Sequence, residues 1–438
     1  MKYSQPKGTF DVLPQQLKAE DAWKLSERWR FVEQILHQTA SDYGFKEIRT
    51  PIFESTDLFI RSVGDASDIV SKEMYTFEDK GGRSMSLRPE GTAPVIRAFI
   101  ENHLYQFGSD HKLCYTGPYF RYDRPQAGRF RQLHQFGVEA IGRSDPFQDV
   151  EIIDLLCEMY RRLGIKDLKV LINSVGDAPS RDCYQKALVD YLTPHAANLS
   201  EDSKVRLQKN PLRILDTKDP KDIELLKNAP PLANYLSEAS KKHFDQVCLF
   251  LSKIGIDFHI DPRLVRGLDY YNQTVFEVTS NVLGAQSSIG GGGRYDGLIK
   301  ALGGPDLPSI GFGTGIERIL LTMQGQHCYF PKAPAPFAFL IPLGEASHEI
   351  GFMTLCKLRH AKIPSDIYIK SSKMQKALQE ASASNATYSI IIGEQELKQE
   401  IAQVKNMLTR EFENIPLKNL FSYLVTIWEK SCLEKNLK

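Results

Sequence analysis

The stretch Arg121-Tyr-Asp-Arg-Pro-Gln-Ala-Gly-Arg-Phe-Arg131 separates two runs of strand-forming residues that together extend from about 113 to 142. Two such runs around a turn that contains Pro and Gly predict an antiparallel hairpin with a long loop. The loop holds four arginines, although the whole chain has a formal net charge of only +1. Because guanidinium groups stay ionised and fork onto phosphate oxygens, we expect this loop to receive a polyphosphate.

Period-2 alternation along the second strand predicts that one face is polar. That face carries Arg131, Leu133, Gln135, Gly137 and Glu139. If the turn centres near Ala127, Arg121 pairs opposite Leu133 and points to the same face. The opposite face, with His134, Phe136, Val138 and Ala140, is expected to be the core face. A solvated polar sheet face is the alternative, but the arginine-rich loop favours a binding site.

Composition limits the class of protein. A length of 438 residues favours two or three domains, and 42% hydrophobic with 25% charged residues is typical of a soluble globular protein. There is no apolar run long enough for a membrane span and no secretory signal at the start. The seven cysteines are scattered and lack C-x-x-C spacing, which favours reduced thiols in the cytoplasm over disulfides or a zinc site.

Helical and strand-like segments alternate along the chain. Helix patterns cover residues 23–40 and 149–163. Phe45–Phe53 has a strand pattern interrupted at Pro51, a residue suited to an edge or an interface. Residues 178–247 are expected to form a helical insertion, after which strand patterns resume over 258–278.

The last quarter of the chain is expected to be a separate domain. Pro331-Lys-Ala-Pro-Ala-Pro336 has the composition of a stiff linker. After it, strand and helix patterns alternate, which predicts a small α/β domain. The predicted boundaries are 1–325 for the first domain, 326–336 for the linker and 337–438 for the last domain.

Three further segments have glycines at places where the backbone could approach a ligand. Ser86–Pro94 places Glu90 and Thr92 beside Gly91, although a capped helix start would also explain Thr92. The run Gly290–Gly293 is not followed by the G-K-[ST] of a phosphate loop, and tight sheet packing explains it equally well. Gly311–Arg318 lacks the dinucleotide-binding fingerprint and is better explained as a strand-to-helix junction with Arg318 at the helix start.

Together with Arg266-Gly-Leu-Asp-Tyr-Tyr271, these segments resemble a known family closely. The chain resembles the class II aminoacyl-tRNA synthetases, and specifically the histidyl-tRNA synthetases of bacterial type. The resemblance comprises several independent motifs in the right order over nearly the whole chain. Gly44–Pro51, Tyr119–Glu139 and Gly311–Arg318 are similar to class II motifs 1, 2 and 3, Arg266–Tyr271 and Gly291–Asp296 to the histidine-specific signatures, and Asn210–Asp216 to a bacterial feature of the insertion.

The resemblance implies a fold and a reaction. The fold is an α+β catalytic domain built on an antiparallel sheet flanked by helices, with a helical insertion and a C-terminal α/β anticodon-binding domain. The reaction is the ATP-dependent ligation of L-histidine to tRNA(His) through a histidyl-adenylate, which releases AMP and diphosphate. Because no covalent enzyme intermediate is needed, positioning and charge carry the catalysis. The resemblance also implies Mg²⁺ and a homodimer, while the metal ligands are not assigned.

The same resemblance gives roles to the arginines. Arg121 and Arg266 are the implied catalytic residues, on opposite sides of the α-phosphate. Arg129 and Arg318, together with Arg121, are the implied ATP-binding residues. Arg124 and Gln126, at the tip of the loop, are expected to meet the acceptor end of the tRNA.

Histidine recognition is assigned to a second set of residues. The implied histidine-binding residues are Glu90, Gly91, Thr92, Arg121, Gln135, Glu139, Arg266, Tyr270 and Tyr271. Within this set, Glu139 and the two tyrosines bracket the imidazole. Imidazole has one donor and one acceptor nitrogen, and a site that pairs both rejects isosteres lacking them by about 10⁴–10⁵.

Two positions depart from the family pattern. Asp123 stands where motif 2 usually carries Glu, which implies a shorter or water-bridged contact toward ATP. Leu133 stands where a Phe usually stacks on adenine, so only apolar contact with the ring is expected there. Neither change affects the expected phosphate or histidine contacts.

Two other classes share the fold. A histidine-sensing regulatory paralogue usually lacks the Arg266–Tyr271 signature and the C-terminal domain, and this chain has both. A pseudo-synthetase that only binds tRNA would have lost the phosphate-binding arginines. Histidine-dependent exchange between ATP and pyrophosphate separates the enzyme from both, because neither alternative should catalyse it.

Overall fold

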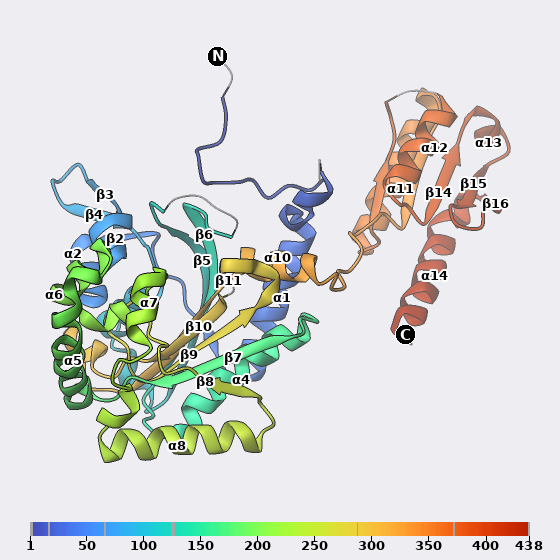
Figure 1. Cartoon of the computed structure of the whole chain (residues 1–438). Helices are drawn as coiled ribbons and strands as arrows, with labels where there is room; N and C mark the ends of the chain where they lie inside the picture. Colours follow the sequence, from blue (N-terminus) through green and yellow to red (C-terminus); the bar gives the residue numbers. More distant parts are fainter. Residues whose placement is uncertain are drawn as a thin grey trace. The chain divides into compact units, whose positions relative to one another are not determined.

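The computed structural model describes residues 3–15, 18–64, 67–123, 128–286, 288–370 and 373–436. The chain folds into two compact units, Met1–Pro331 and Lys332–Lys438, which we call the N-terminal and the C-terminal unit (Figure 1). Among the described residues, no helix combines the length and the apolar character that crossing a membrane would need.

The N-terminal unit is built on an eight-stranded sheet with the order β1-β5-β6-β11-β10-β9-β7-β8. The six central strands pair antiparallel, whereas β1 runs parallel to β5 and β8 parallel to β7 at the two edges. In that order the strands are β1 (Lys46–Glu47), β5 (His111–Phe120), β6 (Gln132–Ile141), β11 (Ser309–Gly315), β10 (Ser288–Arg294), β9 (Asn272–Ser280), β7 (Leu168–Ser174) and β8 (Phe258–Ile260). The predicted fold class, a largely antiparallel sheet flanked by helices, is confirmed.

Four helices cover one face of this sheet. They are α1 (Ser26–Asp42), α4 (Pro146–Arg162), α8 (Glu238–Lys253) and α10 (Ile316–Gly325). The predicted core face of β6 is confirmed, because Phe136, Val138 and Ala140 are buried in the main apolar cluster beneath these helices. The other face of the sheet is thereby left for polar side chains.

The predicted hairpin exists as β5 and β6, but its predicted register was wrong by two residues. Tyr119 lies opposite Leu133, and the backbone N–H of Arg121 donates to the carbonyl of Arg131 over 2.9 Å. A shift of two residues preserves the side-chain alternation, so Arg121 still shares a face with Gln135 and Glu139.

The predicted strand Phe45–Phe53 is divided between two sheets. β1 joins the edge of the large sheet, while β2 (Phe53–Ser55) belongs to a small sheet with the order β2-β4-β3. The other two strands of this small sheet are β3 (Tyr75–Glu78) and β4 (Ser84–Leu87). The helices nearby are α2 (Thr56–Val63), α3 (Thr92–Glu101) and α9 (Leu298–Ala301).

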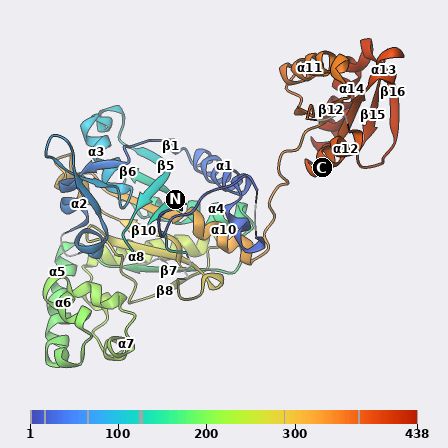
Figure 2. The same cartoon turned by 90° about the horizontal axis from the view of Figure 1, so that it is seen from above.

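The predicted insertion contains helices with their own core. α5 (Ala178–Leu192), α6 (Glu201–Lys209) and α7 (Pro220–Leu226) lie together at one side of the sheet, in green in Figure 2. Their apolar residues, including Leu188, Leu192 and Leu226, form a cluster separate from the main core. The predicted end at 247 falls inside α8, whose residues Phe244, Val247 and Leu251 are part of the main core.

The C-terminal unit is a five-stranded sheet with the order β13-β12-β14-β15-β16, in which β15 and β16 pair antiparallel. The strands are β12 (Ala338–Pro342), β13 (Ser365–Ile367), β14 (Tyr388–Ile392), β15 (Ile401–Asn406) and β16 (Phe412–Pro416). The helices are α11 (Glu345–His360), α12 (Met374–Ala383), α13 (Glu394–Lys398) and α14 (Leu417–Asn436). As predicted, strands and helices alternate from β12 to β14, and α13, β15, β16 and α14 follow.

The first residues of the predicted linker pack against the N-terminal unit. The side chain of Gln326 pairs with the backbone of Lys166 through two hydrogen bonds, at 2.8 and 2.9 Å. The guanidinium of Arg28 lies 4.3 Å from the centre of the Phe330 ring. The N-terminal unit therefore extends as far as Pro331.

Candidate active site

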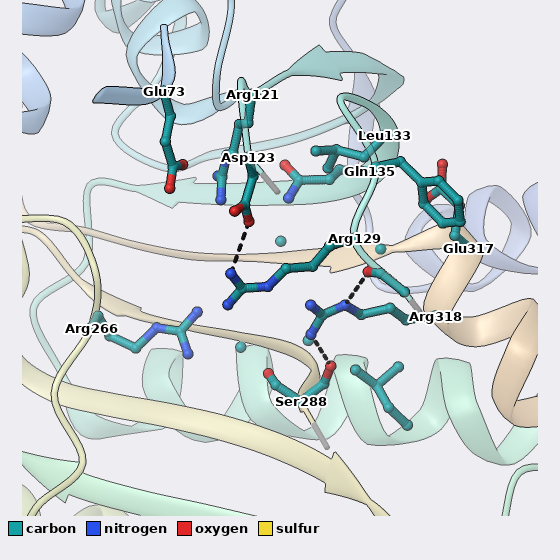
Figure 3. A pocket seen from close by; sticks show the side chains of 17 residues that line it. Glu73, Arg121, Asp123, Arg129, Leu133, Gln135, Arg266, Ser288, Glu317 and Arg318 are labelled. Carbon is teal, nitrogen blue, oxygen red and sulfur yellow. Dashed lines mark hydrogen bonds and ion pairs between the residues drawn. The ribbon is translucent and has the colours of Figure 1, made fainter. Parts of the chain in front are cut away.

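A cavity of about 270 Å³ opens on the polar face of the large sheet, and four arginines line it. Figure 3 shows the guanidinium groups of Arg121, Arg129, Arg266 and Arg318 directed toward the same space. They come from the end of β5, the hairpin loop, the segment before β9 and the start of α10. Segments far apart in the sequence thus converge on one site for anionic groups.

Two of these arginines are held by backbone carbonyls. Arg318 donates from Nε to the carbonyl of Gly128 over 3.2 Å and from Nη1 to the carbonyl of Ser288 over 2.6 Å. Arg121 donates from Nε to the carbonyl of Pro89 over 2.9 Å. Neutral acceptors fix the two side chains without cancelling their charge, which stays available to a ligand.

The other two arginines pair with carboxylates in the cavity wall. Arg129 Nη1 lies 2.8 Å from Asp123 Oδ2, and Arg266 Nη1 lies 2.6 Å from Glu277 Oε2 on β9. Asp123, the position that departs from the motif, therefore holds an arginine that is expected to bind ATP. Arginine has five N–H donors, so one guanidinium can bond to a carboxylate and to phosphate oxygens at the same time.

Glycines on β10 bring the backbone into the cavity wall. A Cβ at Gly291 would lie 2.6 Å from the carbonyl oxygen of Phe276 and 2.8 Å from Nη1 of Arg266. A Cβ at Gly292 would lie 1.9 Å from the carbonyl oxygen of Gly311. These distances support the tight-packing explanation of the glycine run, and Gly290 and Gly291 also line the cavity, so the run has both roles.

Glu139 lies farther along the same face of β6 and accepts three hydroxyl hydrogen bonds. Thr92 and Tyr115 each donate to Oε1 over 2.8 Å, and Tyr295 donates to Oε2. Only 1% of Glu139 is exposed, and burial raises the pKa of its carboxyl to about 7. A carboxylate so placed can accept an N–H from a neutral ligand ring while three hydroxyls fix its position.

Glu90 and Gly91 directly precede α3, whose first residue, Thr92, bonds to Glu139. The Glu90 carboxylate accepts the backbone N–H groups of Thr92 at 2.7 Å and Ala93 at 2.8 Å, so Glu90, rather than Thr92, caps the helix. Burial raises the pKa of Glu90. A Cβ at Gly91 would lie 2.3 Å from the Tyr115 ring, so only glycine fits under that ring.

Tyr270 and Tyr271 lie near Glu139 and Glu90, and together these residues form a polar cluster. The ring centres of the two tyrosines lie 4.7 Å apart, and the Tyr270 ring meets Tyr295 edge-on at 5.7 Å. Burial raises the pKa of both phenols. Tyr270 therefore lies beside Tyr295, which bonds to Glu139, and Tyr271 lies next to Tyr270.

The structure brings most of the predicted site residues into two adjoining groups. Arg121, Arg129, Gln135, Arg266 and Arg318 line the cavity. Glu90, Gly91, Thr92, Glu139, Tyr270 and Tyr271 form the polar cluster, and the two groups are linked by the row of side chains along β6. Arg124 and Gln126 lie outside the described residues.

The site also contains residues that were not predicted. Glu73 lines the cavity, Glu277 pairs with Arg266, and Tyr115 and Tyr295 bond to Glu139. The alternation applied to β6 would have found Tyr115 on β5, because it lies directly opposite Gly137. Tyr295 belongs to the signature Gly291–Asp296, but it was not among the predicted site residues. Glu73 and Glu277 carry no local sequence signal.

The described residues contain no group of three His, Cys, Asp or Glu side chains arranged to hold a metal ion. Mg²⁺ bound together with a nucleotide needs fewer protein ligands, because phosphate oxygens and water supply the rest. Glu73 and Asp123 line the cavity and offer carboxylate oxygens, the kind of ligand that Mg²⁺ prefers.

Comparisons with known proteins agree over both units. The family model described as histidyl-tRNA synthetase matches residues 8–319, and the model described as anticodon binding domain matches residues 338–427. The histidine–tRNA ligase of Protochlamydia amoebophila is 53% identical over 407 residues, covering 93% of this chain and 96% of that protein. That of a Geobacillus species is 46% identical over 427 residues, covering 97% and 99%.

A solved structure shares the fold. The crystal structure of apo histidyl-tRNA synthetase from S. aureus superimposes with a TM-score of 0.81 at 39% identity, covering 97% of this chain and 100% of that one. An antiparallel sheet with an arginine-lined cavity and an appended anticodon-binding domain defines a class II aminoacyl-tRNA synthetase. Within that class, the chain belongs to the histidyl-tRNA synthetase family. The predicted family and enzyme class are confirmed.

Proposed function

We propose that the cavity binds ATP and that the adjoining polar cluster selects L-histidine, so that the chain makes histidyl-adenylate and then histidyl-tRNA(His). The observation that carries this proposal is the convergence of Arg121, Arg129, Arg266 and Arg318 on one cavity beside the buried Glu139. The cavity offers positive charge, as expected for a reaction in which two bound substrates react directly with each other.

In the first half-reaction a carboxylate oxygen of histidine attacks the α-phosphorus of ATP. A new P–O bond forms, the bond to the bridging oxygen breaks, and diphosphate leaves with the electron pair. Negative charge builds up on the equatorial oxygens in the transition state. Arg121 and Arg266 are the proposed donors to these oxygens, and Arg129 and Arg318 the proposed partners of the leaving phosphates.

In the second half-reaction a ribose hydroxyl at the tRNA 3′ end attacks the carbonyl carbon of the adenylate, and AMP leaves. Arg124 and Gln126 are proposed to contact the acceptor end of the tRNA. The predicted domain 337–438, within the C-terminal unit, is proposed to contact the anticodon. Between Pro331 and Lys438 the chain carries 14 basic and 11 acidic residues, a small excess that fits contact with RNA.

Histidine recognition is assigned to the polar cluster. Glu139 is proposed to accept the imidazole N–H, with Tyr270 and Tyr271 against the ring. Glu90, Gly91 and Thr92 are proposed to meet the ammonium group, and Gln135 the carboxylate. A ligand that cannot pair with Glu139 would leave a buried carboxylate unsatisfied, and this penalty is what gives selectivity.

Three further assignments belong to this proposal. Mg²⁺, held by Glu73 or Asp123 together with the phosphates, would neutralise charge on ATP when bound. A homodimer is proposed from the resemblance of Gly44–Pro51 to class II motif 1. A cytoplasmic location is proposed from the scattered, free cysteines among the described residues.

The test is histidine-dependent exchange of labelled pyrophosphate into ATP by the purified full-length chain. Exchange that requires histidine, and that other amino acids do not support, is the expected result. A folded protein that binds histidine without exchange would favour a regulatory role instead. Charging of tRNA(His) transcripts with labelled histidine then tests the second half-reaction.

A further inference from the structure

The segment from Arg266 to Tyr271 contains no helix or strand, and it carries the proposed catalytic arginine. Three polar side chains of the helical insertion contact it. Arg213 Nη1 donates to the carbonyl of Arg266 over 3.3 Å, and Asn210 Nδ2 donates to Oδ1 of Asp269 over 2.7 Å. Arg181 Nη1, on α5, donates to the carbonyl of Tyr271 over 3.0 Å. The insertion therefore contacts this segment at its beginning, middle and end.

Apolar packing ties the same segment to the insertion. Leu264 and Val265, which lead into it, are buried in the apolar cluster of the insertion, and Tyr271 packs against that cluster. Arg213 also lies against Gly267, where a Cβ would be 3.3 Å from Nη1. The backbone of the segment thus takes its position from the insertion as well as from the sheet.

The rest of the N-terminal unit also contacts these six residues. Glu277 on β9 pairs with the guanidinium of Arg266, and the backbone N–H of Asp269 donates to the carbonyl of Val63, at the end of α2, over 3.4 Å. Glu277 fixes the head of Arg266, while Arg213 fixes its backbone. With both ends held, Arg266 has little freedom to turn away from the cavity, even though its buried Nε has no hydrogen-bond partner among the described residues.

We infer that Asn210 and Arg213 of the insertion are positioning residues for adenylate formation, acting through Arg266. This inference rests on the proposed role of Arg266, and it gives a function to Asn210–Asp216, which the proposed reaction leaves unexplained. It makes the insertion part of the first half-reaction, which requires no tRNA. A catalytic arginine displaced by about 1 Å can cost about 10²-fold in rate.

The experiment measures histidine-dependent pyrophosphate exchange by the full chain without tRNA. Asn210→Ala/Arg213→Ala is expected to lower kcat about 10- to 100-fold. The KM for ATP should change little, because Arg129 and Arg318 keep their contacts. Lys204→Ala is the matched control: Lys204 lies on the same insertion, in helix α6, and its ion pair is with exposed Glu201. This control should exchange at the normal rate.

A double-mutant cycle separates positioning from general support of the fold. In an Arg266→Ala background, Asn210→Ala/Arg213→Ala should cost little further rate, because the residue through which they act is already gone. If the combined variant loses rate by the product of the two separate factors, the inference is overturned. A normal kcat in Asn210→Ala/Arg213→Ala would also overturn it. If Arg266→Ala itself exchanges normally, the proposed role of Arg266 fails instead, so the two failures are distinguishable.

A second comparison covers the case in which the pair variant is poorly folded. Asn210→Asp would set a carboxylate against the carboxylate of Asp269, whereas Asn210→Ala removes one hydrogen bond only. If Asn210 acts through Asp269, kcat should be highest in the wild type, lower in Asn210→Ala and lowest in Asn210→Asp. The two variants should have similar melting temperatures. Equal rates for Ala and Asp would contradict a role that passes through Asp269.

Discussion

The phenolic oxygen of Tyr115 donates a 2.8 Å hydrogen bond to Oε1 of Glu139, from β5 to the neighbouring strand β6. The Tyr115 ring covers Gly137, where a Cβ would lie 2.4 Å from the ring, and it also covers Gly91. One aromatic side chain therefore fixes the carboxylate proposed to read imidazole and fills the space over two glycines. If Glu139 selects histidine as proposed, selectivity depends on a carboxylate that is held by hydroxyl groups.

Glu139→Gln should weaken the binding of histidine far more than the binding of ATP. An amide can give the imidazole N–H only a neutral hydrogen bond, in place of a charge-assisted one of about twice the strength. The measurement is the KM for each substrate in pyrophosphate exchange, with wild type alongside. Equal changes in both KM values would mean that Glu139 has only a structural role.

The same substitution should change the pH dependence of stability. Burial raises the pKa of Glu139 from 4.5 to about 7, so the folded chain binds this proton more tightly than the unfolded chain does. Ionisation of Glu139 therefore costs stability as the pH rises from about 4.5 to 7. Glu139→Gln removes this cost, and its free energy of unfolding relative to wild type should rise by about 3 kcal/mol between pH 4.5 and 8. Urea unfolding at several pH values measures this, and a pH-independent difference would contradict the raised pKa.

Arg266→Ala should abolish most adenylate formation without unfolding the protein. Removing one preorganised donor to a developing oxyanion costs about 10²–10³ in rate, or roughly 3–4 kcal/mol. Exchange kinetics and the melting temperature are both needed, because Glu277 loses its partner in this variant. Since the Glu277 side chain is 24% exposed, water can solvate it, and the melting temperature should move little. A near-normal exchange rate in the folded variant would remove Arg266 from the mechanism.

Leu133→Phe should tighten ATP binding. Leu133 lines the cavity in the row that continues to Gln135, at the position where the motif usually carries Phe. Aromatic contact with adenine adds about 0.5–1.5 kcal/mol beyond the area buried. The KM for ATP should fall accordingly while the KM for histidine stays the same. No change in the KM for ATP would place adenine elsewhere.

A chain ending at Pro331 should keep histidine-dependent exchange and lose most tRNA charging. The four arginines that line the cavity precede this point, while the match to the anticodon-binding domain begins at residue 338. Ending at Pro331 retains the contacts of Gln326 and Phe330 with the N-terminal unit. The loss should appear as a raised KM for tRNA, measured on a truncated protein shown to be soluble and of the same oligomeric state. Charging at the full-length rate would refute an anticodon role for the C-terminal unit.

The alternation of side chains between the two faces of a strand could be predicted from sequence, because successive residues of any strand point to opposite faces. That is why Gln135 and Glu139 were placed on the same face as Arg121, even with a register wrong by two residues. The register itself depends on how the loop closes, which local sequence does not specify. The roles of the site residues came from the resemblance to a family and not from the residues alone.

The contacts that sequence reasoning missed depend on how irregular segments fold back. Glu277 meets Arg266 because the segment that precedes β9 turns back beside this strand, and Asn210 meets Asp269 because the insertion packs against the same segment. Neither contact has a periodic signature, since each depends on the path of a segment that is neither helix nor strand. The division of Phe45–Phe53 between two sheets is a consequence of the same kind.

The glycine run has a consequence for inhibitor design. Where Gly290 and Gly291 line the cavity, a ligand rests on peptide backbone, and any replacement must add at least a methyl group. At Gly291 that group would lie 2.6 Å from a backbone oxygen, and at Gly290 it would lie 2.4 Å from the Tyr160 hydroxyl. Resistance mutations at these two positions would therefore damage the enzyme itself. Resistance to a compound that mainly contacts this backbone should therefore arise only from substitutions elsewhere in the cavity wall.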